Sequence, residues 1–296
     1  MTEALAEEVR KCYADPLRFV RMAYPWRERG PLEHHDGPDR WQEEALRYIG
    51  EQVRRHSFDG KKPVPPIRIA VPSGHGIGKG ALAAWVTDWI MSTRPGSKGS
   101  VTANTAKQLS TKTWATIVQW TKLCITSDWF EITSELMWWK GQGGKSTWFA
   151  AALTCAPENA EAFQGQHAPS GTSFYIFDEC SNIDKRIWEA AEGGLTDGEP
   201  MFLAFGQPTR TDGTFYEITV GDKRDRWHQI PVDSRDSRLT NKALIQEWLD
   251  DYGEDSDFFR VRVRGLPPRA GDLQFISSDA VYQAQKRDLP VQTCRS

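Results

Sequence analysis

Apolar and polar positions recur along this chain with two different periods. Short apolar runs, typical of buried strands, occur at 67–71, 99–104, 173–179 and 200–205, and weaker runs predict strands at 227–232 and 258–263. Helical spacing is found at 40–49, 81–91, 106–124, 184–192 and 241–252. This succession of strands and helices predicts an α/β fold with a mostly parallel central sheet and helices on both faces.

Two segments fall outside this alternation. Residues 1–27 are expected to form one or two helices, interrupted at Pro16. Aromatic runs at 136–139 and 146–151 flank a glycine-rich turn and predict a β-hairpin. The Gly-Lys-Ser-Thr letters at 144–147 lie within this hairpin. These four residues match the end of the P-loop sequence pattern. We do not interpret them as a phosphate loop, because no helix is expected after them and Trp139 stands where the pattern requires glycine.

A glycine-rich loop joins the first strand to the helix at 81–91, which we expect to be amphipathic. The loop reads Ser73, Gly74, His75, Gly76, Ile77, Gly78, Lys79 and Gly80. Glycines let successive backbone N–H groups turn toward a phosphate, the positive end of the helix faces the same anion, and a lysine reaches the outer phosphates. An ordinary tight turn is the alternative interpretation. Lysine at position 79 argues against the dinucleotide site of an NAD-type enzyme.

The loop departs from the P-loop pattern at both ends. Ser73 replaces the first glycine, and Gly80 replaces the Ser or Thr whose hydroxyl binds Mg²⁺. The first change is tolerable at a turn, whereas the second removes a specific metal contact. Nucleotide binding is therefore a firmer expectation than hydrolysis.

Two carboxylates follow the apolar run at 173–177. Acidic residues at the carboxyl end of a buried parallel strand lie where ligands bind in α/β sheets. Asp178 can hold Mg²⁺ through water, and Glu179 can orient or deprotonate a water that attacks the outermost phosphate. Alone, the pair could equally cap the helix at 184–192. Together with the loop, it favours a hydrolytic nucleotide site.

Two further places carry weaker signals. Gln207 follows the strand at 200–205 and could sense the γ-phosphate, although a plain turn is favoured on chemistry alone. Trp41 and Gln42, upstream of the loop, suit adenine recognition by stacking and bidentate hydrogen bonds, but Trp41 could instead pack in the core. The His34–His35 pair has no partner at a metal-binding spacing, so we interpret it as a surface loop.

Composition narrows the class of protein. The 296 residues are 39% hydrophobic, carry a net charge of −3 and include five scattered cysteines without a Cys-x-x-Cys pair. We expect neither a zinc site nor a disulfide framework, and a reducing, cytosolic setting fits. No run approaches the ~18 apolar residues of a membrane span, and the acidic N-terminus is unlike a signal peptide. Any contact with DNA must be local.

These motifs, in this order, resemble those of a known family. Trp41–Gln42, the loop at 73–80, the strand at 174–179, the tip at 206–209 and the segment at 260–267 are together similar to the ATPase half of the large terminase subunit of tailed bacteriophages, over about residues 15–275. The resemblance implies an ASCE, RecA-like ATPase fold. It also implies ATP and Mg²⁺ as cofactors, and a homo-oligomeric ring that moves double-stranded DNA into a procapsid.

The same resemblance implies roles and partners. Lys79 matches the phosphate-binding lysine, Asp178 the acid on the Mg²⁺ side and Glu179 the catalytic glutamate. Gln42 matches the adenine-side glutamine, and Gln207 falls in the coupling motif. The implied partners are DNA, the portal protein and the small terminase subunit, with the host cytoplasm and the procapsid portal vertex as locations and no membrane.

Three departures from the family pattern qualify the resemblance. Gly80 lacks the metal-binding hydroxyl. His75 stands where the family often has arginine, so its charge depends on pH. We expect no RNase H-like nuclease half within these 296 residues. A ring ATPase commonly borrows an arginine from a neighbouring subunit, for which the candidates are Arg186, Arg210, Arg235 and Arg238.

We therefore expect a helical, adenine-side segment at 1–60, an ATPase core at 61–265 and a linker or tail at 266–296. Two alternatives remain. One is a non-hydrolysing nucleotide- or DNA-binding remnant of such a motor. The other is a helicase-like ATPase, which would require a second loop-and-acid set that this sequence lacks.

Overall fold

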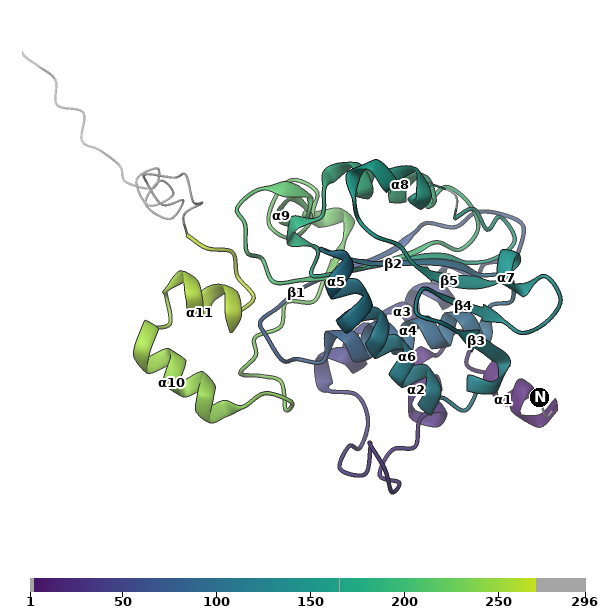
Figure 1. Cartoon of the computed structure of the whole chain (residues 1–296), viewed down its shortest axis with the longest axis horizontal. Coiled ribbons are helices and arrows are strands. Elements are labelled where there is room, and N and C mark those ends of the chain that lie inside the picture. The colour runs from purple at the N-terminus through teal and green to yellow at the C-terminus, as the bar shows by residue number, and fades with distance from the viewer. Residues whose placement is uncertain (1–2, 165, 270–296) are drawn as a thin grey trace, which may run out of the picture.

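The computed structural model describes residues 3–164 and 166–269 and is built on one eight-stranded sheet (Figure 1). The strand order is β3-β4-β5-β2-β6-β7-β1-β8, and all pairings are parallel except those of β4 with β3 and β5. The predicted mostly parallel sheet is confirmed. The strands are β1 (Ile67–Pro72), β2 (Lys98–Ala103), β3 (Phe130–Ile132), β4 (Leu136–Trp139), β5 (Phe149–Ala152), β6 (Ser173–Asp178), β7 (Met201–Gly206) and β8 (His228–Gln229).

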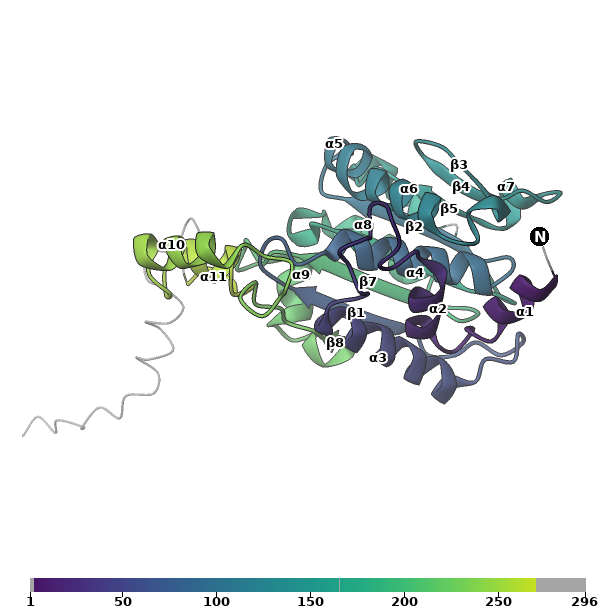
Figure 2. The same ribbon diagram turned by 90° about the horizontal axis from the view of Figure 1, so that it is seen from below.

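Helices cover both faces of the sheet, as predicted. Figures 1 and 2 show α8 and α9 on one face and α2, α3, α4 and α6 on the other. The helices are α1 (Glu3–Arg10), α2 (Pro16–Ala23), α3 (Arg40–His56), α4 (Lys79–Thr93), α5 (Ala106–Gln108), α6 (Trp114–Leu123), α7 (Gly144–Thr147), α8 (Lys185–Gly193), α9 (Gly213–Thr219), α10 (Lys242–Tyr252) and α11 (Asp257–Arg262).

A short π-helix, Leu109–Thr113, joins α5 to α6. The remaining turns are 3₁₀ segments at Ser127–Trp129, Pro157–Phe163, Cys180–Asn182 and Arg224–Arg226. None of the helices in the described ranges is long and apolar enough to cross a bilayer.

The central strands bury side chains on both faces, which explains their continuous apolar runs. In β6, Phe174 and Ile176 belong to the larger core beside α4, whereas Tyr175 and Phe177 belong to the smaller core beneath α8 and α9. Helices α1 to α3 contribute to the larger core. The proposed division at residue 60 thus separates segments that share one core, and it stays a prediction. Most of the predicted tail at 266–296 lies outside the described residues.

Helix α4 is more deeply buried than its sequence predicted. We expected an amphipathic helix at 81–91, but 13 of the 15 residues of α4 are buried. The helix lies between the sheet and α6, with α2 and α1 on its other sides. Several of its polar side chains are bonded internally: Asp88 accepts hydrogen bonds from Tyr24 and Thr121, and Thr87 donates to the carbonyl of Ala83. The loop is therefore anchored to the least exposed helix of the molecule.

The predicted strand at 258–263 is wrong, because this segment is helix α11. A weak apolar run predicted the strand, yet the two fully buried residues are Phe259 and Val263, four positions apart, which is helical spacing. Ser256 caps the helix by accepting a hydrogen bond from the N–H of Phe259.

Two other predicted elements are present in the structure with different boundaries. The strand predicted at 227–232 is reduced to β8 and a bridge from Val232 to Ser73. The predicted hairpin is present as antiparallel β4 and β5, but its turn contains the four-residue helix α7 and the second strand begins at Phe149.

A buried ion pair ties α4 to the end of the molecule opposite the loop. The Nε atom of Arg94 lies 2.7 Å from Oε2 of Glu199, and the two side chains are 2% and 1% exposed. Glu199 also accepts hydrogen bonds from Thr172 and Tyr13. Removing one charge would leave the other buried without compensation, which typically costs several kcal/mol.

We expect Glu199→Gln to lower the free energy of unfolding by about 3–5 kcal/mol, measured by urea denaturation with tryptophan fluorescence. Glu189→Gln, which breaks the exposed pair with Lys185, is the matched control and should cost less than about 1 kcal/mol. Equal, small effects of the two changes would contradict the assigned role of the buried pair.

Candidate nucleotide-binding site

The glycine loop and the acidic pair meet at one edge of the sheet. Strand β7 lies between β1, which leads into the loop, and β6, which ends at Asp178. All three strands are parallel, so their carboxyl ends share this edge, where ligands bind in α/β sheets. An open cleft there is lined by His75, Gly76, Ile77, Gly78, Lys79, Gly80, Lys112, Thr113, Thr116, Asp178 and Glu179.

The loop presents unpaired backbone donors to this cleft. Gly76 and Gly78 have φ angles of 74° and 85°, a region that favours glycine. Within the described part of the chain, the N–H groups of residues 76–80 have no hydrogen-bond partner, whereas those of Ser73, Gly74 and His75 are bonded to carbonyls. Consecutive unpaired N–H groups at the start of a helix form an anion-binding nest.

Lys79 lies folded along the loop. Its ammonium group donates to Oγ of Ser73 at 3.3 Å and to the carbonyl of Gly74 at 3.4 Å, and it lies 3.8 Å from Oε1 of Glu179. The side chain is 10% exposed. A buried lysine with these weak contacts is available to an anion in the cleft.

The two carboxylates differ in surroundings. Asp178 is buried, and it accepts hydrogen bonds from Thr113 at 2.7 Å and from the N–H of Glu179. Burial, followed by the negative charge of Glu179, raises the pKa of Asp178. Glu179 has a φ of 47°, which is rare for a residue other than glycine and marks local strain of the kind found at functional sites. Its carboxylate is more exposed and faces Lys79.

Helix α3 supports the loop from behind. The indole of Trp41 donates to the carbonyl of Ile77 at 3.0 Å, and the amide of Gln42 donates to the carbonyl of Gly78 at 2.9 Å. The amide oxygen of Gln42 accepts from the N–H of Asp39, which completes a capping box. Both side chains are buried and engaged within the protein. Their assignment to adenine stays a prediction.

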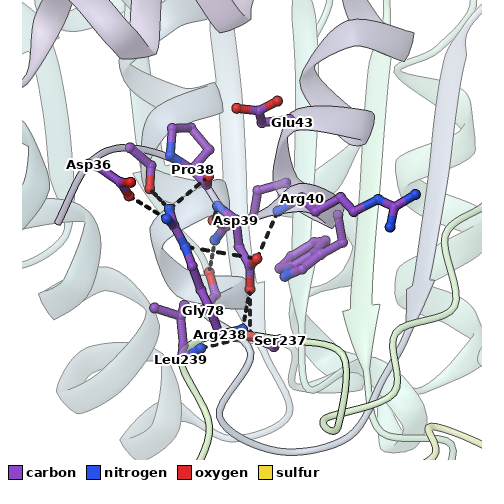
Figure 3. A network of polar contacts seen from close by, with 12 residues as sticks. Asp36, Pro38, Asp39, Arg40, Glu43, Gly78, Ser237, Arg238 and Leu239 are labelled. Atoms are coloured by element: carbon purple, nitrogen blue, oxygen red, sulfur yellow. Dashed lines mark hydrogen bonds and ion pairs between the residues drawn. The ribbon is translucent and has the colours of Figure 1, made fainter.

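Asp39 links this support to the C-terminal segment (Figure 3). Its carboxylate accepts from the hydroxyl of Ser237 at 2.6 Å and from the N–H of Arg238 at 3.1 Å. The guanidinium of Arg238 reaches back to Asp36 and to the carbonyls of residues 37 and 38. Segments about 200 residues apart in sequence thus lie together beside Gly78.

The C-terminal segment also contacts the loop directly. The N–H of His75 donates to the carbonyl of Arg262 at 2.8 Å, and Ser234 donates to the carbonyl of His75. Gly74 has no space for a side chain, because a Cβ there would lie 2.4 Å from the carbonyl oxygen of Val263. Helices α10 and α11, which lie beyond the end of the sheet in Figure 1, are therefore tied to the loop by their last turn.

His75 lies between two side chains. Its Nδ1 is 2.5 Å from the amide of Gln207, and its Nε2 is 3.1 Å from Nη1 of Arg262. Arginine can only donate, so Nε2 accepts and the proton of the neutral ring is on Nδ1. The Gln207 amide must then present its oxygen to the ring, an orientation assigned from the hydrogen-bond pattern.

The pKa of His75 is lowered from 6.5 to about 4 by partial burial first, and then by the positive charges of Lys79, Arg262 and Lys112. The imidazole is therefore neutral at pH 7. The sequence predicted a pH-dependent charge at this position. In the structure, the imidazole gains its positive charge only at acidic pH, near its pKa of about 4. A bound anion would offset the surrounding positive charge and raise this pKa.

The cleft brings together most of the predicted site residues. Loop residues 75–80, Asp178 and Glu179 line it. Ser73, Gly74, Trp41, Gln42 and Gln207 lie behind or beside these. Sequence reasoning missed Lys112, Thr113 and Thr116, which line the cleft from the π-helix and α6. The available signal was a cluster of β-branched hydroxyl residues at the start of a helix, where such residues are not favoured.

The four candidate arginines all form ion pairs within this chain. Arg186 pairs with Asp184, Arg210 with Asp212, and Arg235 with Asp233 and Glu254. Arg238 is occupied by the network beside Asp39. Their assignment to a neighbouring subunit's site stays a prediction.

Histidine-selective NMR should show His75 titrating with a pKa of about 4, with His75→Gln used to assign the resonance. The unfolded chain, with a pKa near 6.5, takes up the proton first. This residue therefore lowers folding stability as the pH falls from about 6.5 toward 4 and has no effect above that range. A titration midpoint near or above 6.5 would contradict the assigned surroundings.

Comparison with known proteins places these features in context. No family model matches the chain. A protein of Enterobacteria phage P7 named "Probable terminase, large subunit" is 28% identical over 242 residues, which are 75% of this chain and 47% of that protein. The chain thus spans about half the length of this curated relative.

Solved structures give the fold. The large terminase of a thermophilic bacteriophage in complex with ADP is matched with a TM-score of 0.56 and 14% identity, over 77% of this chain and 53% of that one. The complex of the same terminase with ATP-γ-S is matched with a TM-score of 0.52, over 77% and 52%. The predicted α/β fold is confirmed, since the chain has the fold of this solved large terminase, and in sequence it is similar to the large terminase subunit of Enterobacteria phage P7.

Proposed function

We propose that this chain binds ATP and hydrolyses it as the motor domain that packages viral double-stranded DNA. The observation that carries the proposal is the run of unpaired N–H groups at residues 76–80 facing Lys79, Asp178 and Glu179 across one cleft. The terminase of the thermophilic bacteriophage, which has this fold at low sequence identity, is described with ADP and with ATP-γ-S.

Each group has a defined task in this proposal. The N–H groups of the loop and the ammonium of Lys79 hold the phosphates and offset their charge. Glu179, strained and partly exposed, accepts a proton from a water aimed at the γ-phosphate. Asp178, held by Thr113 and the N–H of Glu179, remains fixed on the far side of the cleft.

The donor set fits Mg²⁺. Among the described residues, no group of three or more His, Cys, Asp or Glu side chains could hold a metal alone. Mg²⁺ does not require one, because it is usually held by one or two carboxylates with phosphates and waters. Asp178 would hold it here. The ion would neutralise charge between the β- and γ-phosphates.

Gln207 and His75 form the proposed path from the site to the C-terminal helices. Gln207 follows β7, bonds to His75 and, through it, reaches Arg262 at the end of α11. A change in the charge of the outermost phosphate would act on the neutral imidazole first. Helices α10 and α11 would then respond, because Arg262 of α11 is hydrogen-bonded directly to His75.

The wider assembly follows from the resemblance. We infer a ring of identical subunits that acts on double-stranded DNA in the host cytoplasm, with the portal protein and the small terminase subunit as partners at the procapsid portal vertex. A neighbouring subunit would supply an arginine to the cleft, because no arginine within residues 3–164 and 166–269 lines it.

The second candidate is a nucleotide-binding remnant that does not hydrolyse. Gly80, which lacks the usual hydroxyl, favours it. The two candidates make the same prediction for nucleotide binding and opposite predictions for turnover, so both must be measured.

Lys79→Ala should weaken binding of ATP by roughly 10- to 150-fold, because hydrogen bonds to charged groups contribute about 1.5–3 kcal/mol. Isothermal titration calorimetry measures this loss. Lys145→Ala, the same change in the Gly-Lys-Ser-Thr run at 144–147, is the matched control and should bind as the parent does. Equal affinity of all three proteins would exclude the proposed site.

Glu179→Gln should retain nucleotide binding and lower the rate of phosphate release by about 10²- to 10⁴-fold, the usual range for a general base. A parent chain that binds ATP without releasing phosphate, even with DNA and partner subunits present, would favour the non-hydrolysing remnant.

A further inference from the structure

Thr116 packs closely against Gly80. A Cβ built on Gly80 would lie 3.2 Å from Cγ2 of Thr116, 3.6 Å from its Cβ and 3.7 Å from its Oγ1. Thr116 is in the first turn of α6, which packs along α4. Its side chain therefore lies directly beside the place that a Ser or Thr side chain at position 80 would take, with the methyl group nearest and the hydroxyl 3.7 Å from the Cβ position.

The hydroxyl of Thr116 differs from those of several helical threonines, which are bonded within their own helix. Thr87, Thr93 and Thr219 donate to the carbonyl four residues earlier, at 2.6 to 2.8 Å. Within the described residues, no hydrogen bond involves Oγ1 of Thr116, although the residue is partly buried and lines the cleft with Lys79, Asp178 and Glu179.

A second hydroxyl group of the same segment, that of Thr113, contacts Asp178, the residue proposed to hold Mg²⁺. Thr113, three residues earlier, donates to Oδ2 of Asp178 at 2.7 Å and is 3% exposed. It ends a π-helix, an irregularity that is frequent at functional sites. Thr113 and Thr116 thus lie near the start of one helix, where Thr113 contacts Asp178 and Thr116 contacts the loop at Gly80.

We propose that Thr116 supplies to Mg²⁺·ATP the hydroxyl that Gly80 lacks, and that Thr113 positions Asp178 beside it. The proposal rests on the proposed function. Glycine at 80 is then a requirement for Thr116 to approach and not a sign of decay. Hydroxyl, carboxylate and phosphate oxygens are the ligands that Mg²⁺ prefers.

The geometry also predicts how position 80 tolerates change. A contact of 3.2 Å is tighter than an ordinary van der Waals contact, so a side chain at 80 and Thr116 compete for one space. Gly80→Ser alone should therefore not improve metal-dependent binding. The double variant Gly80→Ser/Thr116→Ala has its hydroxyl on residue 80, in the loop. The smaller side chain at position 116 removes the steric conflict with residue 80.

The experiment compares the affinity for the fluorescent analogue mant-ATPγS in MgCl₂ and in EDTA by fluorescence anisotropy. We expect the parent chain to bind more tightly with Mg²⁺. Thr116→Val, which keeps the shape and removes the hydroxyl, should reduce this Mg²⁺ enhancement roughly 10- to 100-fold, the usual effect of altering a group around a metal. Its affinity in EDTA should equal that of the parent, which also shows that the variant is folded.

Thr111→Val is the matched control, because Thr111 is exposed on the same segment and bonds to the carbonyl of Lys107. It should keep the full enhancement, and Gly80→Ser/Thr116→Ala should recover most of it. An undiminished enhancement in Thr116→Val, or a parent that binds equally with and without Mg²⁺, overturns the inference and leaves nucleotide binding intact. A parent that binds in neither condition overturns the proposed function itself.

Discussion

The site depends on how the carbonyl groups of the glycine loop are held. The carbonyls of Ile77 and Gly78 accept hydrogen bonds from Trp41 and Gln42, and that of His75 accepts one from Ser234. A peptide unit whose oxygen is fixed on one side presents its N–H on the other. The unpaired N–H groups of Gly76, Gly78 and Lys79 therefore face the cleft, because α3 and the C-terminal segment hold the carbonyl side of the same peptide units.

This constraint explains why distant parts of the chain meet at the loop. Asp39 caps α3 and also receives Ser237 and Arg238, so the support from α3 and the course of the C-terminal segment are fixed together. Arg262 and Gln207 reach the loop through His75. Displacing any of these groups would alter the donors that face the cleft, and the same contacts provide a route by which a bound phosphate could act on α10 and α11.

The sequence predicted the parts of this arrangement that are local. Buried strands of the sheet read as apolar runs, and the loop and acidic pair follow two of these strands directly, so their meeting at one edge could be predicted. Helix α11 could not, because its short Arg-Val alternation has the period of a strand while its burial at Phe259 and Val263 depends on α10. The function of Trp41 and Gln42 as supports was hidden for a similar reason, since their acceptors lie 36 residues away.

In our proposal, Thr113 and Thr116 complete in space a motif that is incomplete in sequence. A P-loop pattern requires its hydroxyl next to the lysine because it describes consecutive residues, whereas a metal ion requires only an oxygen in the right place. Strand β2 pairs with β6, so the helical segment that follows β2 begins at the same edge as Asp178. From there, Thr113 donates a hydrogen bond to the acid, and Thr116 packs beside the position where a side chain at residue 80 would begin. The absence of a side chain at position 80 and the close packing of α6 against the loop thus belong together. This relation can be seen only when the pairing of β2 with β6 is known.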